Sequence, residues 1–121
     1  MNDYGIIVEY EIEDGRDEEF LALITDHARR TREEEPGCLR FEVLRPVKRS
    51  GAAIPNRFMV NELYAGMAAI EAHEASQRLA RLREALAPLV KSRRLVMMES
   101  LEQRTSEEGI RPQDLSAAND D

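Results

Sequence analysis

The order in which two sequence periodicities follow one another limits the folds open to this chain more than any other feature. Residues 4–12 alternate apolar with polar side chains, the period of two that a half-buried β-strand requires. Residues 16–35 instead carry an apolar stripe at helical spacing. The remaining patterns predict, in chain order, a strand at 38–46, a strand at 57–65, a helix at 67–75 that continues beyond a break near Ser76 and ends or bends near Pro88, and a strand at 92–102.

This β-α-β-β-α-β order predicts a ferredoxin-like α+β sandwich, with both helical segments on one face of a four-stranded antiparallel sheet. A chain of 121 residues has room for one such domain and no second core. We therefore expect a folded domain at 1–102 and a polar, acidic tail at 103–121. The tail is predicted either to be flexible or to clasp a partner subunit.

The limits of the first helix also have sequence signals. Asp14 is a suitable N-cap residue, and Asp17 begins a run of acids suited to the positive end of the helix dipole. Pro36 and Gly37 stop the helix. Cys38 then opens the next strand with no base near it in sequence, so we interpret it as a small packing residue rather than a nucleophile.

Charge and composition exclude several functions. With 17 basic and 24 acidic residues the net charge is −7, which argues against nonspecific binding to nucleic acid or an anionic membrane. The chain shows no signal peptide and no apolar run long enough to span a bilayer, so we expect a cytoplasmic protein. The single cysteine cannot form an internal disulfide, and neither metal-ligand spacing nor a Gly-rich phosphate loop is present. No cofactor and no metal are therefore expected.

The predicted sheet leaves one face without helices. By strand phase that face carries an apolar group mixed with polar residues, although a phase shift of one residue would exchange the two faces. Two such faces packed around a twofold axis would cover each other, so we predict a homodimer. The apolar members are Ile7, Met59, Leu63, Val96 and Met98, and the polar members are Glu9, Arg40, Glu42 and Asn61.

Three segments carry a family resemblance: "YEIEDGRDEEFLALITDHARRTREEEPGCLRFEVLRP", "NRFMVNELYAGMAAIEAHEAS" and "LREALAPLVKSRRLVMMESL". They resemble the antibiotic biosynthesis monooxygenase (ABM) family, and in particular quinol monooxygenases, over roughly residues 4–101. The resemblance implies a dimeric α+β barrel with a pocket between sheet and helices in each subunit. It also implies oxygenation without metal, flavin or haem, in which a deprotonated, electron-rich aromatic reacts directly with O2.

Two departures from the family pattern narrow the expectation. Many relatives carry a second histidine two positions after the Ala-His-x-x-Ser segment, where this chain has Arg78. The haem-degrading branch relies on a tryptophan, and this chain has none. Haem cleavage is therefore not expected.

The candidate catalytic residues are His27 and His73, each in phase with apolar residues of a helix, where a histidine serves either as a structural hydrogen-bonding group or as a pocket base. The candidate substrate-binding residues are Arg40, Asn61, Glu62 and Tyr64. Glu62 and Tyr64 share a strand face, so Glu62 could orient a histidine while Tyr64 lines an aromatic pocket. Asn61 faces the other way and could steady an anionic oxygen. The basic run Lys91–Arg94 is either a solvated edge or a phosphate ligand.

These features predict a cofactor-independent monooxygenase acting on a quinol-like or other electron-rich aromatic small molecule, with His27 or His73 generating the substrate anion. Two alternatives stay open. The same proton-transfer groups could serve an isomerase of a phosphorylated signal sugar, with Lys91–Arg94 on the phosphate. A noncatalytic dimeric barrel that binds a small metabolite is the other.

Overall fold

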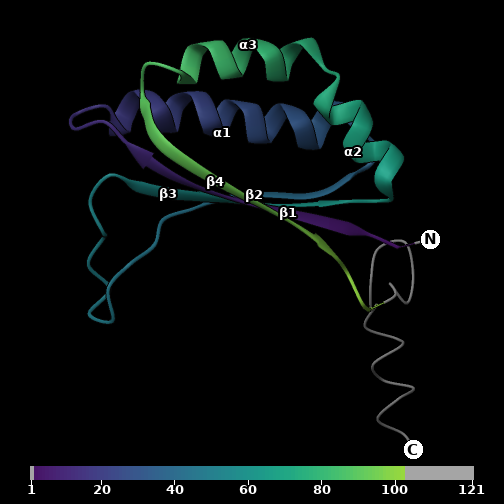
Figure 1. Cartoon of the computed structure of the whole chain (residues 1–121), viewed down its shortest axis with the longest axis horizontal. Helices are drawn as coiled ribbons and strands as arrows, with labels where there is room; N and C mark the ends of the chain where they lie inside the picture. The colour runs from purple at the N-terminus through teal and green to yellow at the C-terminus, as the bar shows by residue number, and fades with distance from the viewer. Residues whose placement is uncertain (1, 103–121) are drawn as a thin grey trace, which may run out of the picture.

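The computed structural model describes residues 2–102, so the predicted tail at 103–121 lies outside the described residues. A four-stranded antiparallel sheet in the order β2-β3-β1-β4 is covered on one face by helices (Figure 1). This confirms the ferredoxin-like α+β prediction. The elements are β1 (Tyr4–Ile12), α1 (Asp17–Glu34), β2 (Cys38–Leu44), β3 (Arg57–Tyr64), α2 (Met67–Glu74), α3 (Gln77–Leu86) and β4 (Val90–Glu99).

The strand register fixes which side chains meet the helices. Val8 in the central strand β1 is paired with Val60 of β3 on one side and with Leu95 of β4 on the other. These residues and those two positions away face the helices, because side chains alternate along a strand. The buried core accordingly combines this sheet face with the stripe of α1, including Ile6, Val8, Phe58, Val60, Phe20 and Ile24.

Helix α1 begins at Asp17, two residues later than an N-cap at Asp14 would place its start. The residue before its first turn is Arg16, which makes no side-chain capping bond, so the prediction of Asp14 as the N-cap is wrong. Asp14 instead accepts a hydrogen bond from the Asn56 side chain, across the loop that leads into β3. Gly15, between Asp14 and Arg16, has φ of 77°, a left-handed turn conformation. This turn separates Asp14 from the first turn of the helix.

The corner after α1 packs closely against α2. Cys38 N donates to the Glu35 carbonyl (3.0 Å), and Ala65 N donates to the Gly37 carbonyl (2.9 Å), which closes the turn. A Cβ placed on Gly37 would lie 2.5 Å from the Cβ of Ala69, so no larger residue fits without movement. Glu35 is thereby held beside the junction of α2 and α3.

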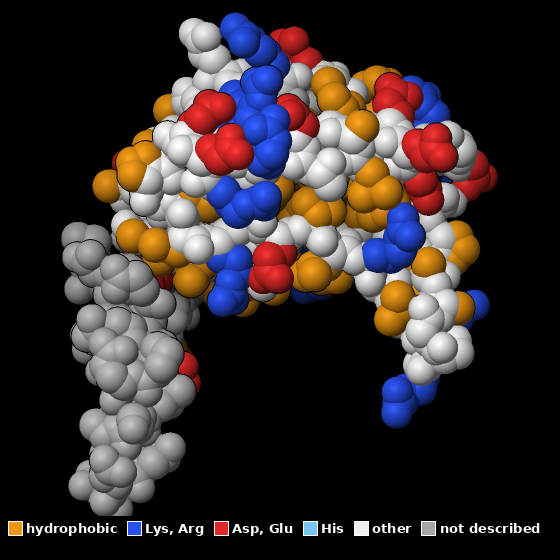
Figure 2. Space-filling view, turned by 180° about the vertical axis from the view of Figure 1, so that it is seen from behind, with side chains coloured by type: hydrophobic (Ala, Val, Ile, Leu, Met, Phe, Trp, Pro, Cys, Tyr) orange, Lys and Arg blue, Asp and Glu red, His pale blue; other side chains and the backbone are white. Residues whose placement is uncertain are grey.

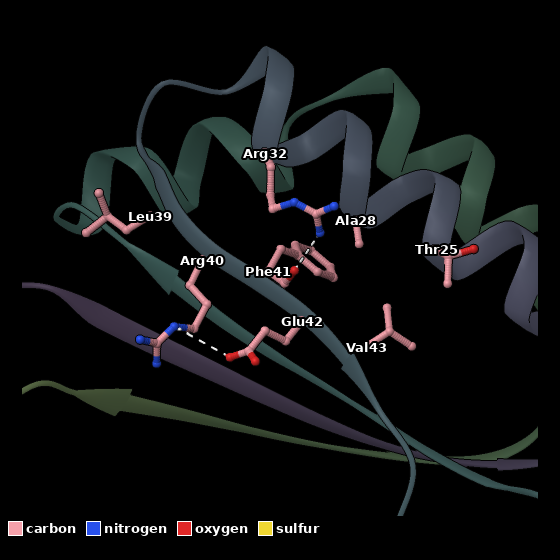
Figure 3. A pocket seen from close by; sticks show the side chains of 8 residues that line it. All are labelled: Thr25, Ala28, Arg32, Leu39, Arg40, Phe41, Glu42 and Val43. Atoms are coloured by element: carbon pink, nitrogen blue, oxygen red, sulfur yellow. Dashed lines mark hydrogen bonds and ion pairs between the residues drawn. The ribbon is translucent and has the colours of Figure 1, made fainter. Parts of the chain in front are cut away.

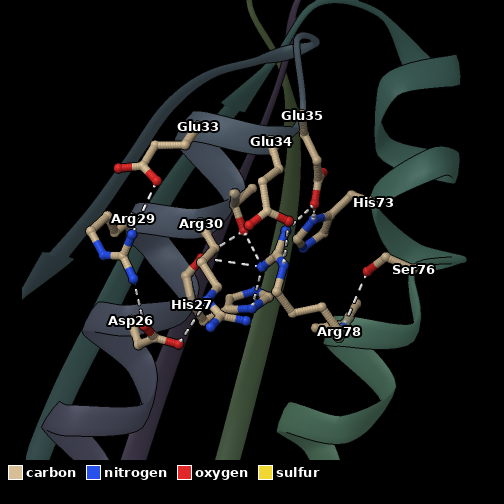
Figure 4. Close-up of polar contacts among 12 residues, drawn as sticks. Asp26, His27, Arg29, Arg30, Glu33, Glu34, Glu35, His73, Ser76 and Arg78 are labelled. Atoms are coloured by element: carbon tan, nitrogen blue, oxygen red, sulfur yellow. Dashed lines mark hydrogen bonds and ion pairs between the residues drawn. The ribbon is translucent and has the colours of Figure 1, made fainter.

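The predicted break in the second helical stretch is confirmed at Ser76. Helix α2 ends at Glu74, and Ser76 caps α3 by accepting from Leu79 N at 3.1 Å. The change of direction places His73 at the end of one helix and Arg78 in the first turn of the next, so both turn toward the C-terminal part of α1 (Figure 4).

The uncovered sheet face carries the predicted residues. Arg40 pairs with Leu63, and Glu42 with Asn61, between β2 and β3, while Val96 is opposite Ile7. The face lies on the side of the sheet opposite the helices, and the loop between β2 and β3 projects past it at one side (Figure 1). In the space-filling view, apolar and charged side chains both reach the lower edge of the body (Figure 2). Apolar and polar side chains are mixed on it, as predicted from the sequence. Arg40 lies near Glu42 (3.5 Å), and the remaining pairs join Arg57 to Glu11 and Arg94 to Glu9.

Candidate functional site

A small internal cavity of about 60 Å³ lies between the helices and the covered sheet face. Aliphatic side chains share its lining with groups that can exchange protons or donate hydrogen bonds, among them His27 from α1, His73 from α2, Glu62 from β3 and Tyr10 from β1. Phe41 also lines it, with its ring 5.4 Å from that of His27. Two histidines and a carboxylate therefore meet in a volume that holds about two water molecules.

Arg78 is the centre of the polar contacts beside this cavity (Figure 4). Its Nη1 donates to His27 Nδ1 (2.8 Å) and to Thr31 Oγ1 (2.8 Å), and its Nη2 donates to Glu35 Oε2 (2.6 Å). The Arg78 side chain is 17% exposed and that of Glu35 is 20% exposed, so this is a largely buried ion pair. Neither residue was predicted for the site, although Arg78 was noted as a departure from the family pattern.

The contact with Arg78 determines the proton position on His27. A guanidinium has only N–H donors, so Nδ1 of His27 must accept, and the ring proton resides on Nε2. Burial, with the positive charge of Arg78 second, lowers the pKa of His27 to about 3. His27 is thus a neutral imidazole at pH 7, and its remaining N–H lies on the side of the ring away from Arg78.

His73 has the opposite arrangement. Its Nδ1 lies 2.9 Å from Glu35 Oε1, and the second oxygen of the same carboxylate accepts from Arg78 Nη2. His73 Nδ1 therefore donates, which leaves Nε2 as an acceptor, 3.9 Å from Glu62 Oε1. Burial lowers the pKa of His73, and the Glu35 carboxylate opposes that shift. The two rings, with centroids 5.4 Å apart, present one donor and one acceptor nitrogen.

Two carboxyl groups line the cavity: Glu74, which is exposed, and Glu62, which is buried. Glu62 is the candidate for chemistry. It is 6% exposed and accepts a hydrogen bond from Tyr64 Oη at 2.6 Å. Burial raises the pKa of Glu62 to about 7, although the bond from Tyr64 favours the ionised form. Burial and the neighbouring Glu62 raise the pKa of Tyr64 above its usual range, so the phenol stays protonated. Glu62 is consequently divided between its acid and its base forms near neutral pH.

A second, more open hollow of about 350 Å³ adjoins the cavity. The two share Tyr10, Arg83, Leu86 and Arg93 in their walls, so the larger hollow leads from the surface toward the buried groups. Its size falls within the range of small-molecule pockets, about 300–1,000 Å³. Its outer wall is formed by Ala87 and Val90, between α3 and β4.

The other predicted residues lie apart from this cavity. Arg40 and Asn61 are on the uncovered sheet face, and Arg40 also lines a shallow hollow of about 790 Å³ along the edge strand β2 (Figure 3). Within that hollow Arg32 already donates to the Phe41 carbonyl at 2.7 Å. The run Lys91–Arg94 divides, because Arg93 lines the cavity while Arg94 lies 3.5 Å from Glu9 on the opposite face.

Cys38 is half-buried, and its thiol lies 3.4 Å from the Arg40 carbonyl, to which it donates. Burial raises the pKa of Cys38 to about 11, which keeps it in the unreactive thiol form at neutral pH.

In residues 2–102 no three His, Cys, Asp or Glu side chains are arranged to hold a metal ion. No helix in the same residues has the length and apolar character of a membrane span.

Fold and site together define a small α+β protein with a titratable cavity enclosed between its sheet and its helices. Residues 3–85 match the sequence model of the family described as Antibiotic biosynthesis monooxygenase. The chain belongs to that family. No functionally curated protein matches it.

Solved structures with the same fold include two that are described as "putative antibiotic biosynthesis monooxygenase". The protein from Caulobacter crescentus is 22% identical with a TM-score of 0.74, over 84% of this chain and 92% of that one. The protein from Nitrosomonas europaea is 23% identical with a TM-score of 0.71, over 82% and 90% of the two chains. At this identity the likeness establishes the fold.

Proposed function

We propose that the protein is a cofactor-independent monooxygenase of an electron-rich aromatic small molecule such as a quinol. The observation that carries the proposal is the buried Glu62 carboxyl, with a pKa of about 7, beside an acceptor nitrogen of His73 in the cavity between sheet and helices. General bases act best when their pKa lies near the working pH. Membership of the antibiotic biosynthesis monooxygenase family supports the reaction class.

In this mechanism the Glu62 carboxylate removes a proton from the substrate. His73 Nε2 lies 3.9 Å from Glu62 Oε1, so it would take that proton onward through one intervening water or after a small approach of the two groups, and Glu35 would stabilise the resulting imidazolium at Nδ1. His73 keeps the role of base predicted from the sequence, now in series with Glu62. His27 takes a different role, because its Nδ1 is occupied by Arg78 and its pKa is far below neutrality.

His27 is suited to stabilise the substrate anion. A neutral imidazole whose proton is fixed on Nε2 is a hydrogen-bond donor, and such a donor stabilises a developing oxyanion in a poorly hydrated site. The anion transfers electrons to O2 and forms a carbon–oxygen bond, which gives a hydroperoxide once a proton returns. Loss of the C–H proton from that carbon, together with cleavage of the O–O bond, leaves a carbonyl there and releases water. The substrate is oxidised by four electrons in all, and O2 is reduced by the same number.

The sizes of the inner cavity and the outer hollow suggest which part of the substrate each one holds. The inner cavity of about 60 Å³ is too small for an aromatic ring but has room for O2 and the reacting edge of a substrate. The outer hollow of about 350 Å³ is large enough for the ring itself. The aliphatic side chains of the inner cavity, among them Ile6, Val8 and Leu82, limit the water around the reacting edge of the anion.

A homodimer is part of the proposal. The uncovered sheet face carries Leu63 and Met98 among alternating charges, and two copies related by a twofold axis would bury both apolar groups. We expect sedimentation equilibrium to give twice the monomer mass, and Leu63→Glu to shift it toward the monomer. The cytoplasmic location predicted from the sequence remains a prediction.

Oxygen uptake with a panel of hydroquinones tests the reaction. Glu62→Gln is nearly isosteric and cannot accept the proton, so we expect kcat/KM to fall by about 10²- to 10⁴-fold. Glu71→Gln is the matched control, because Glu71 is exposed on α2 and should leave uptake unchanged. His73→Ala should lower the rate as well. Uptake that survives in both Glu62→Gln and His73→Ala would remove the proposed base.

An isomerase of a phosphorylated sugar is the second candidate, favoured by the same pair of groups. Glu62 and His73 could move a proton between adjacent carbons without any oxygen. Turnover of a phosphorylated keto sugar under anaerobic conditions would support it. Ligand-induced stabilisation with no turnover of either substrate class would instead indicate a noncatalytic binding protein.

A further inference from the structure

The passage from the surface to the inner cavity has a charge pattern that the proposed mechanism does not use. Arg83 on α3 and Arg93 on β4 line both the outer hollow and the inner cavity. Arg93 is the register partner of Tyr10, so their side chains lie next to each other on the covered sheet face. The two arginines therefore flank the point where the two hollows join.

The donors at this junction have no acceptor in the part of the chain described, residues 2–102. Neither Arg83 nor Arg93 forms an ion pair there, whereas the neighbouring Arg94 pairs with Glu9. The Tyr10 hydroxyl likewise has no hydrogen-bond partner among those residues, although Tyr10 is 7% exposed. Three donor groups thus surround one solvent-connected space.

The Tyr10 hydroxyl keeps its proton at neutral pH. Burial, with a contribution from the charge of Glu62, raises the pKa of Tyr10 to about 12, while the charges of Arg93 and Arg83 act against that rise. A protonated phenol and two guanidinium groups offer only hydrogen-bond donation to a bound anion. Guanidinium groups are well suited to the paired oxygens of a carboxylate or phosphate.

The rest of the outer hollow suits the apolar part of such a ligand. Leu86, Ala87 and Val90 form its wall beside the two arginines. An aromatic ring against this wall would direct its reactive edge inward, because the hollow continues into the cavity that Glu62 and His73 line. The anionic group of the ligand would thus lie at the arginines, and the reacting atoms would lie beside Glu62 and His73.

We propose that the substrate carries an anionic group, a carboxylate or a phosphate, and that Arg83, Arg93 and the Tyr10 hydroxyl bind it. The proposal rests on the proposed function in one respect, since it names the class of substrate for the same cavity. The chain has a net charge of −7 and would repel an anion at long range. The unpaired arginines provide local attraction at the entrance.

Anaerobic calorimetric titration separates binding from any reaction with O2. The probes are hydroquinone, 2,5-dihydroxybenzoate as its carboxylate analogue, and 4-hydroxyphenyl phosphate as its phosphate analogue. We expect at least one charged probe to bind about tenfold more tightly than hydroquinone, the scale of one charge-assisted contact. The preference should weaken as ionic strength rises. The stronger of the two charged probes identifies the anion.

Arg83→Gln and Arg93→Gln should each remove most of the preference for the charged probe over hydroquinone. The matched controls are Arg81→Gln on α3 and Arg94→Gln on β4, which change the net charge equally but line neither hollow. Circular dichroism melts of all four variants exclude a folding defect.

Equal affinity for charged and neutral probes, including no binding by either charged probe, overturns the proposal. So does a preference that persists in both Arg83→Gln and Arg93→Gln. The outcome is independent of the oxygenase proposal. Selective anion binding without oxygen uptake would contradict the oxygenase proposal and support the anion site. Oxygen uptake that does not depend on the charge of the quinol would support the oxygenase and contradict the anion site.

Discussion

Arg78 and Glu35 form a largely buried ion pair, 2.6 Å between Nη2 and Oε2. Each of the two residues also forms a hydrogen bond with one histidine of the candidate site. Arg78 donates to His27, and Glu35 accepts from His73. The pair thus sets the two imidazoles as opposite tautomers. One ion pair, formed between the end of one helix and the first turn of another, therefore defines both the donor and the acceptor of the candidate site.

Removal of Arg78 should be costly for stability. Arg78→Met leaves the Glu35 carboxylate largely buried without its cation, so we expect a loss of about 3 kcal/mol in the free energy of unfolding. Urea denaturation measures it. Arg30→Met is the control, because Arg30 is half exposed and its pair with Asp26 should contribute about 0.5 kcal/mol or less. Equal losses in the two variants would contradict a special role for Arg78.

The tautomers can be observed directly. Nitrogen-15 NMR of labelled histidine should show the proton of His27 on Nε2 and that of His73 on Nδ1 near pH 7. In Arg78→Met the His27 pKa should rise from about 3 toward its ordinary value, since the second-largest cause of its depression is gone. Protonation of wild-type His27 between pH 6 and 7 would disprove this assignment.

The stability of the fold should depend on pH in two opposing ways. The folded pKa of His27 is lowered to about 3, so its burial destabilises the fold increasingly as pH falls from 6.5 toward 3. The folded pKa of Glu62 is raised to about 7, so its burial destabilises the fold increasingly as pH rises from 4.5 to 7. Between pH 4.5 and 6.5 the two effects oppose each other.

Glu62→Gln removes the Glu62 contribution to this pH dependence and leaves that of His27. The variant should gain stability relative to wild type as pH rises from 4.5 to 7, by about 1.4 kcal/mol per pH unit where the difference is steepest. Chemical denaturation at a series of pH values measures the difference. Glu71→Gln should show no such slope, and a flat difference for Glu62→Gln would mean that the carboxyl has an ordinary pKa.

The sheet was accessible from sequence because its signal is local. Alternation along 4–12 and 57–65 assigned Val8 and Val60 to the helix side and Ile7 and Met59 to the other, and the register confirms this. His27, His73, Glu62 and Tyr64 were also selected by phase with apolar neighbours, and the structure brings all four together.

The central ion pair was not accessible in the same way. Glu35 ends a run of three acids that reads as a solvated helix end, and Arg78 lies 43 positions away in the chain. Only the packing of the Gly37 corner against α2 brings them together. The one available signal was the arginine at a place where relatives carry histidine. Asp14 failed as a cap for the related reason that Asn56, distant in sequence, takes its side chain.

The close contact between Gly37 and Ala69 predicts how a larger residue at position 37 changes the stability of the fold. Gly37→Ala places a Cβ 2.5 Å from the Cβ of Ala69, so we expect overpacking to lower the free energy of unfolding by about 1–3 kcal/mol. Thermal melts measure it, and Ala69→Gly in the same chain should restore part of the loss. If Ala69→Gly gives no rescue, the destabilisation arises from the backbone of the turn and not from this contact.

Tyr64 should tune the base without being part of the reaction. Its hydroxyl donates to Glu62 at 2.6 Å, and that bond lowers the Glu62 pKa against the effect of burial. Tyr64→Phe removes the donor, so the pKa of Glu62 should rise above about 7. The rising limb of kcat/KM against pH should move to higher pH by the same amount, with the plateau rate nearly retained. A purely structural role would lower the rate at every pH without moving the limb, and a Tyr4→Phe variant should leave both the limb and the plateau unchanged.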